Sequence, residues 1–262
     1  MSHLTSLEWW FLFPICLAVV ASIAIVAHIV IRKFLGHHVR RSVSHAAPLM
    51  PTLGALFAFL SAFVIATEWT AQSSADSTVA HIAAASARLS WASTAPGANT
   101  IEIQRAISAD LTYTATTGWS ELQNGNELSL VENQSYRNLQ KVVRDSAYSP
   151  SVSTPASNEM LAAVDDLGST RRDLANAAGR TLPTLLLIVL ALSGIVLTIN
   201  SVILVVESPG RSSFVVLSVV LLVAFDLALL LVLAAPLRGT LQASPKPIES
   251  VVNEIDSGFF TR

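Results

Sequence analysis

Charged residues and cysteine are both scarce in this chain of 262 residues. Asp, Glu, Lys and Arg make up 13% of the sequence, against about a quarter in an ordinary soluble domain. The one cysteine, Cys16, excludes a disulfide within the chain and a thiolate cluster for a metal ion. The formal net charge of -2 gives no basis for binding nucleic acid or an acidic partner.

The motifs of the common enzyme classes are also missing. The sequence has no phosphate-binding glycine loop and no Ser, His and Asp set with a local catalytic signature. Asp165 and Asp166 have no partner at metal-ligand spacing and are typical of a solvated helix face. Arg171 and Arg172 are expected to form a surface pair or to donate to those two acids, in preference to forming an anion site. The sequence therefore predicts neither an enzyme nor a cofactor or metal site.

What the chain has instead is four long apolar stretches, two near each end. They are Trp9 to Ile31, roughly Pro51 to Trp69, Leu182 to Val206 and Ser213 to Pro236. Each approaches or exceeds the ~20 residues that cross a bilayer core as a helix. The sequence predicts an all-α membrane protein with four transmembrane helices, arranged as two plus two, and the lipid bilayer as a partner.

These stretches divide the chain into four segments. Residues 1–69 are expected to form a first transmembrane hairpin with a basic loop at 32–50, and residues 182–236 a second hairpin. Residues 70–181 between them form an extramembrane helical module, and residues 237–262 a C-terminal tail. Inside the module, apolar residues recur at three- and four-residue spacing between Gly and Pro breakers, which predicts an antiparallel helical bundle.

The predicted helices of that module follow from the same spacing. The second span is expected to continue as one helix to about residue 93, because no breaker appears before Pro96-Gly97. Further helices are expected over about 99–118, 128–148 and 158–179.

The distribution of basic residues bears on orientation in the membrane. The loop at 32–50 carries Arg32, Lys33, Arg40 and Arg41 and no acidic residue. The positive-inside rule places this loop in the cytoplasm and the module at 70–181 outside, in a multi-pass protein of the cell membrane, expected to be the bacterial inner membrane. Four arginines border the spans on the other side and favour the reverse orientation: Arg171, Arg172, Arg180 and Arg238.

Several polar side chains lie inside the two C-terminal spans. Counting outward from the short turn between them, at ~1.5 Å per residue, puts Asn200 level with Ser218 and Ser193 level with Asp226. These positions predict hydrogen bonds between the two spans, with Gly194 allowing close approach. Asp226 has two interpretations: a protonated or hydrogen-bonded carboxyl that fixes helix packing, or a residue of an ion or proton pathway.

Several short motifs also follow one another along the chain. The second span carries Gly54-Ala-Leu-Phe-Ala-Phe-Leu-Ser-Ala-Phe, then Glu68-Trp69 and an alanine-rich helix. Further positions of the pattern are Trp119, Arg171, Arg172, Pro236 and Gly239, the last two followed by Ser244-Pro245. Taken in order over nearly the whole chain, with Trp69 as the first tryptophan, this pattern resembles the bestrophin-like family of unknown function, a group of bacterial and plant membrane proteins.

The chain departs from that pattern at two places. Gly118 stands where an acid usually precedes the central tryptophan, and Leu237 stands where the closing motif has Phe. Bestrophins are pentameric anion channels, so the resemblance implies an oligomeric channel lined by the second span. In bestrophins the extramembrane module is cytosolic, which conflicts with the orientation that the basic loop predicts.

The resemblance also implies roles for residues of the second span. By analogy Phe59 and Phe63 form an apolar constriction that gates by dewetting, although aromatics at this spacing are also ordinary helix packing. Glu68, at the end of the span, stands where bestrophins carry positive charge and favours cations or weak selectivity.

Two functions remain open from the sequence. The first is an oligomeric ion channel or pore, with Phe59, Phe63 and Glu68 along the second span and Asp226 as a support or relay. The second is a non-conducting membrane scaffold or sensor whose helical module binds a protein partner. A homo-oligomer is expected, and a nucleic-acid partner is not.

Overall fold

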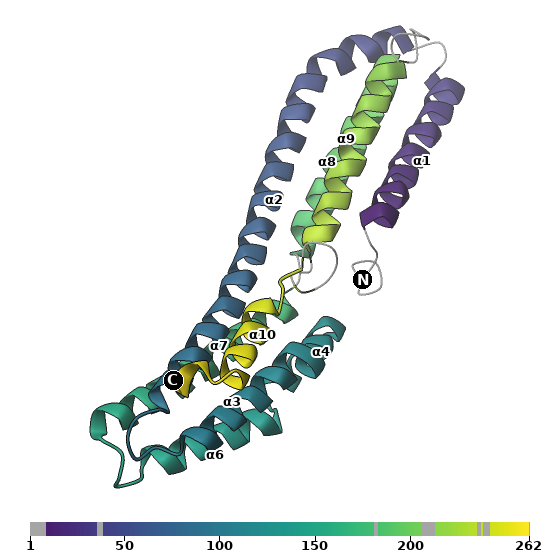
Figure 1. The fold of residues 1–262 in the computed structure, drawn as a ribbon. Coiled ribbons are helices and arrows are strands. Elements are labelled where there is room, and N and C mark those ends of the chain that lie inside the picture. The colour runs from purple at the N-terminus through teal and green to yellow at the C-terminus, as the bar shows by residue number, and fades with distance from the viewer. Residues whose placement is uncertain are drawn as a thin grey trace. The chain divides into compact units, whose positions relative to one another are not determined.

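A computed structural model describes residues 9–35, 39–180, 183–205, 213–234, 237 and 242–261. Its elements are α1 (Trp9–Leu35), α2 (Val39–Ala92), α3 (Thr100–Tyr113), a π-helical turn (Thr114–Gly118), α4 (Trp119–Asn124), α5 (Leu128–Val131), α6 (Gln134–Ala147), α7 (Thr154–Gly179), α8 (Thr184–Val205), α9 (Ser213–Leu233), α10 (Lys246–Asp256) and a 3-10 turn (Phe259–Thr261). Within these ranges every element is a helix, which confirms the predicted all-α class (Figure 1). The chain divides into two compact units, each with a core of its own.

Unit 1 comprises residues 1–70, 181–235 and 239–241. Among the described residues, four helices contain stretches long and apolar enough to cross a membrane: α1, α2, α8 and α9. In unit 1, α1 packs against both α8 and α9, which also pack against each other (Figure 1). Their shared core includes Cys16, Phe57, Leu190 and Val223. Apolar side chains also cover much of the outer surface of these helices, as expected where lipid replaces water.

Helix α2 begins earlier than the predicted loop at 32–50 allows. Residues 39–50 are helical and include Pro48, and Pro51 follows in the same helix. Each proline removes one backbone N–H donor without ending the helix, and Figure 1 shows α2 bending near its N-terminal end. The buried Asn200 of α8 donates its Nδ2–H to the carbonyl oxygen of Ala46 at 3.2 Å. The side chains of residues 34–45, including Arg40 and Arg41, lie outside the described residues.

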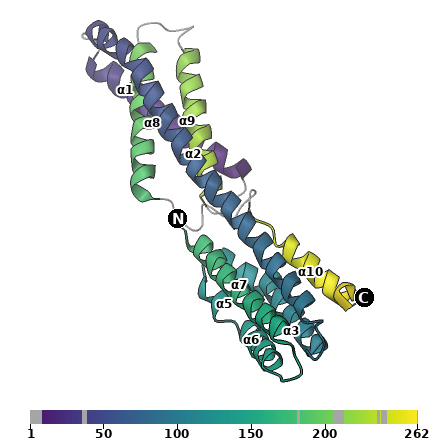
Figure 2. The same cartoon turned by 90° about the vertical axis from the view of Figure 1, so that its left-hand side faces the viewer.

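Unit 2 comprises residues 71–180, 236–238 and 242–262. The C-terminal part of α2 supplies Val79, Ile82 and Leu89 to a core that also contains residues of α3, α6 and α7. Figure 2 shows α6 and α7 running side by side within this unit. The helix expected at 99–118 appears as α3 followed by the π-helical turn. The helix expected at 158–179 appears as α7, which begins at Thr154, four residues earlier than predicted, with Ser153 as its N-cap.

Two features of unit 2 differ from the predicted helix pattern. The helix expected over 128–148 is divided into α5 and α6, because Asn133 adopts an extended backbone and its side chain accepts a hydrogen bond from the N–H of Ser135. The C-terminal tail contains α10, which packs on α3 through Ile248, Val251 and Ile255. This three- and four-residue apolar spacing is a helix signal in the sequence, and it was missed there.

The π-helical turn sets the face on which Trp119 lies. Leu111 and Trp119 are eight residues apart, which at about 100° per residue of α-helix separates their side chains by about 80°. The one extra residue that a π turn accommodates reduces this angle to about 20°. Both side chains are buried in the core of unit 2 as a result. At the end of α4, Gly125 closes the helix with a φ of 89°, a conformation that favours glycine.

Candidate functional site

The exposed face of α2 in unit 1 is aromatic and uncharged. Phe59 and Phe63 lie one helical turn apart, and 70% and 50% of their surfaces are exposed in the single subunit. The described residues exposed between 51 and 70 include no charged side chain. Such a face contacts lipid, another subunit or the lumen of a pore.

The opposite face of α2 packs into unit 1 and carries polar groups. Ser61 is buried and donates its hydroxyl to Oδ2 of Asp226 on α9, at 2.7 Å. Asp226 itself is half-buried. The structure therefore gives the Asp226 carboxyl a partner on α2, whereas the sequence predicted one at the level of Ser193 on α8. Ser61, the one hydroxyl residue in the apolar run of α2 from 53 to 66, was missed.

Glu68 lies on this packed side of α2 as well, with 3% of its surface exposed. Because Ser61 and Glu68 are seven residues apart, they are nearly in register on the helix, about 140° or more away from Phe63. The four residues predicted to form an ion pathway thus separate into two groups. Phe59 and Phe63 lie on the exposed face, and Glu68 and Asp226 belong to the packed interior.

The remaining polar positions of the C-terminal spans make bonds other than those predicted between α8 and α9. Ser193 and Ser218 donate to carbonyl oxygens of their own helices, those of Leu190 and Phe214. Asn200 bonds to α2, as described above, and its Nδ2 also lies 3.4 Å from the sulfur of Met50.

Gly194 is a point of close approach between three helices. A Cβ atom added there would lie 3.0 Å from Cγ1 of Val223 on α9 and 3.3 Å from the ring of Phe57 on α2. Phe57 is fully buried at this crossing, and the sequence did not single it out. The missing side chain of Gly194 is what lets α2 and α9 pack directly against α8.

Arg171 forms a buried network in unit 2, which contradicts the expected surface pair with Arg172. Its Nη1 donates to Oδ2 of Asp110 at 2.7 Å and to the hydroxyl of Thr114 at 2.8 Å, and its Nη2 donates to the carbonyl of Leu130 at 2.9 Å. The guanidinium carbon also lies 4.7 Å from the centre of the Tyr136 ring. Arg172, the next residue, is exposed.

Asp110 is the partner that sequence reasoning missed. It is fully buried, and Ser135 donates a second hydrogen bond to its Oδ1 at 3.1 Å. Burial raises the pKa of Asp110, against the opposing effect of the Arg171 guanidinium and the Ser135 hydroxyl. Asp110 follows Ile107 by three residues, so its place on the apolar face of α3 was a signal available in the sequence.

The other motif positions have different surroundings. Trp119 is buried in the core of unit 2, whereas 60% of Trp69 is exposed. Pro236 and Gly239 lie outside the described residues. At Gly118 a Cβ would lie 3.2 Å from the Tyr113 ring and 3.3 Å from Leu130, so the usual acid of the motif would fit only if these side chains shifted by a few tenths of an ångström.

No group of three or more His, Cys, Asp and Glu side chains in the described residues could hold a metal ion. In unit 1 the described residues of α2 present an apolar exposed face, and the Ser61–Asp226 hydrogen bond lies behind it.

Comparisons with known proteins point to one family. Residues 18–248 match the bestrophin-like domain. No curated protein matches the chain. Among solved structures, a variant of a bacterial bestrophin homologue from Klebsiella pneumoniae has the same fold, with a TM-score of 0.69 at 15% sequence identity. The match covers 95% of this chain and 98% of that one.

Proposed function

Because this chain belongs to the bestrophin-like family, we propose that it forms an oligomeric ion channel whose pore is lined by α2. The observation that carries the proposal is the exposure of Phe59 and Phe63 on one face of a membrane-spanning stretch of α2. In a ring of subunits these aromatics form the narrow apolar constriction, which conducts only when water fills it.

The polar groups on the other face of α2 support this arrangement. The bond from Ser61 to Asp226 holds α2 against α9 from behind the exposed face. A carboxyl within a membrane span is costly unless it is bonded, so Asp226 serves as a support for α2 and not as a wall of the pore. Glu68 is buried too, and the uncharged exposed face predicts weak selectivity between ions of opposite sign.

The membrane arrangement belongs to the same proposal. In chain order, the spanning stretches of α1 and α2 come before residues 71–180 and those of α8 and α9 come after them, and residues 71–180 lie outside the bilayer. The basic residues Arg32, Lys33, Arg40 and Arg41, at the end of α1 and the start of α2, lie in the cytoplasm, and residues 71–180 lie outside the cell.

Ion flux through liposomes that contain the purified protein tests the proposed constriction. Phe63→Ala is expected to raise the flux about tenfold, because a wider and less apolar constriction lowers the barrier by about 1.4 kcal/mol. Phe214→Ala is the matched control, since Phe214 is an exposed aromatic residue on α9, and it leaves the flux unchanged.

The alternative is a non-conducting scaffold that binds a protein through unit 2. Large apolar side chains exposed on this unit favour it, among them Trp91, Ile101 and Tyr148. A silent bilayer at high protein density, or a monomer without an axial opening lined by α2, would contradict the channel and support the scaffold.

A further inference from the structure

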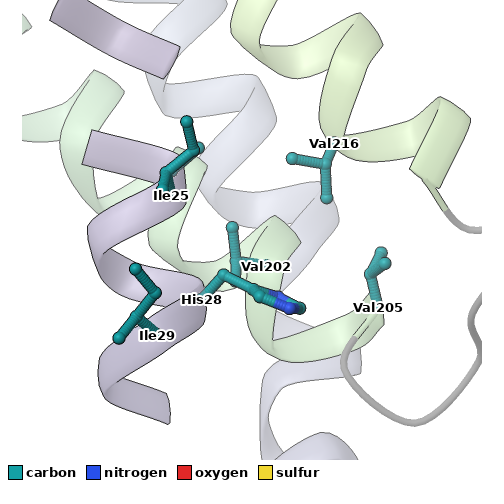
Figure 3. Close-up of a pocket in the computed structure, with 7 residues that line it drawn as sticks. Ile25, His28, Ile29, Val202, Val205 and Val216 are labelled. Atoms are coloured by element: carbon teal, nitrogen blue, oxygen red, sulfur yellow. The ribbon is translucent and has the colours of Figure 1, made fainter. Parts of the chain in front are cut away.

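A pocket opens between α1, α8 and α9 in unit 1. It has a volume of about 260 Å³, and six of the residues that line it are apolar: Ala24, Ile25, Ile29, Val202, Val205 and Val216. The seventh is His28, and Figure 3 shows its ring extending from α1 across the pocket toward α8. Ile25 and Ile29 are exposed at the rim, so the pocket is open on the side of α1.

The pocket lies near one end of the spanning helices. Val205 is the last residue of α8, and Val216 is the fourth residue of α9. Arg32 and Lys33 follow His28 and Ile29 by one turn of α1, so they continue the face that lines the pocket. Both basic residues are exposed. The lining residues His28 and Ile29 and the two cations therefore lie on one face of α1, one helical turn apart.

No acidic side chain among the described residues of these helices neutralises those cations. Described residues of α1 and α8 include no Asp or Glu, and the one acid of α9 is Asp226. Asp226 lies ten residues beyond Val216, or about 15 Å along the helix. In a second copy of unit 1, the two acids of the described spanning residues are also engaged, since Glu68 is buried and the half-buried Asp226 accepts a hydrogen bond from Ser61.

We propose that this pocket binds an anionic glycerophospholipid. Part of one acyl chain occupies the apolar cavity, and the phosphate of the headgroup lies against Arg32 and Lys33, with the His28 ring between the two regions. The bilayer that surrounds the helices supplies such a molecule. Its acyl chain matches the apolar cavity, and its phosphate matches the two cations one turn further along α1.

Native mass spectrometry of the full-length protein in detergent tests this proposal. Equal amounts of dioleoyl phosphatidylglycerol and dioleoyl phosphatidylcholine are added, and the retained lipid is counted. We expect the wild type to retain the anionic lipid at least tenfold more strongly. The double variant Arg32→Gln, Lys33→Gln is expected to lose this preference. The matched control Arg105→Gln, Lys141→Gln, which removes two exposed charges from unit 2, is expected to keep it.

A second variant tests the cavity independently of the charges. Val216→Phe places a larger side chain in the pocket and is expected to reduce retention of phosphatidylglycerol while leaving both cations in place. Inorganic phosphate and the soluble headgroup glycerophosphoglycerol are expected to raise the unfolding temperature of the wild type less than the lipid does. The proposal fails if either soluble anion stabilises the protein as much as the lipid does. It also fails if both lipids are retained equally, or if the double variant binds phosphatidylglycerol like the wild type.

Discussion

At the residue scale, the ion pair of Arg171 and Asp110 stands out because both side chains are enclosed, with 1% and 0% of their surfaces exposed. The attraction between two buried charges does not by itself stabilise a fold, because removing both charges from water costs a similar amount of free energy. Its effect comes from the surrounding hydrogen bonds: Arg171 donates to the Thr114 hydroxyl and the Leu130 carbonyl, and Ser135 donates to Asp110. The pair thereby ties α3, the π-helical turn, α5 and α7 to one another.

Arg171→Met is expected to lower the free energy of unfolding of unit 2 by about 3–5 kcal/mol, because it leaves the Asp110 carboxyl buried without its counter-charge. Chemical denaturation followed by helical circular dichroism measures the change. Arg172→Met, one residue away and exposed, is expected to stay within about 0.5 kcal/mol of the wild type. The double variant Asp110→Leu, Arg171→Met should cost less than the sum of the two single changes, and strict additivity would contradict the pairing.

Gly194 and Gly54 of unit 1 provide a second test at this scale. Gly194→Val is expected to cost about 1–3 kcal/mol, since its side chain would collide with Val223 and Phe57. Gly54→Ala is the control, because a Cβ atom there meets nothing within 4 Å. Gly54→Ala is expected to leave stability unchanged or to raise it by up to about 1 kcal/mol, because alanine has a higher helix propensity than glycine. Thermal unfolding in detergent separates the two variants, and equal effects would rule out the close approach.

At the scale of elements, an exposed ion pair connects α2 and α7 in unit 2. Arg88 binds both carboxylate oxygens of Glu159, with an Nη2–Oε2 distance of 3.1 Å. This hydrogen bonding holds the pKa of Glu159 below its ordinary value of 4.5. A carboxylate whose pKa is lowered by folding stabilises the fold above its unfolded pKa, and this contribution is lost as the pH falls through the folded pKa.

The difference in unfolding temperature between the wild type and Glu159→Gln should therefore be largest near neutral pH and shrink below about pH 4.5. The effect is small, because both side chains are exposed to solvent. Arg88→Gln should show the same pH dependence, and combining it with Glu159→Gln should add nothing. A difference that stayed constant from about pH 7 to about pH 3 would show that this pair does not link the helices.

Most elements were predictable because their signals are local. The apolar runs that became α1, α8 and α9 need only length and composition to identify them, and the three-residue spacing of α3 and α7 is visible in the sequence. Partners were not predictable, because Asp110 meets Arg171 and Ser61 meets Asp226 only after distant segments pack. The division between α5 and α6 depends on Asn133, whose capping role competes with an otherwise continuous helical pattern.

At the scale of the whole molecule, the proposed orientation has a direct test. Asn124, at the exposed end of α4, is replaced by cysteine in a Cys16→Ala background, and intact cells are treated with a membrane-impermeant maleimide. Labelling in intact cells is expected if unit 2 lies outside. A cysteine in place of Lys33, at the C-terminal end of the first span, lies on the cytoplasmic side in this orientation and should react only after lysis. Labelling of the Asn124 site only after lysis would reverse the orientation.

The order in which the chain is translated acquires importance from the position of α10. This helix closes the core of unit 2 on α3, yet residues 242–261 leave the ribosome after α8 and α9 have been made. The apolar surface of α3 that α10 covers therefore stays exposed while α8 and α9 are synthesised and inserted into the bilayer. The core of this unit is therefore completed only after α10 has been made, and a ribosome stalled before Lys246 would leave an open, aggregation-prone intermediate.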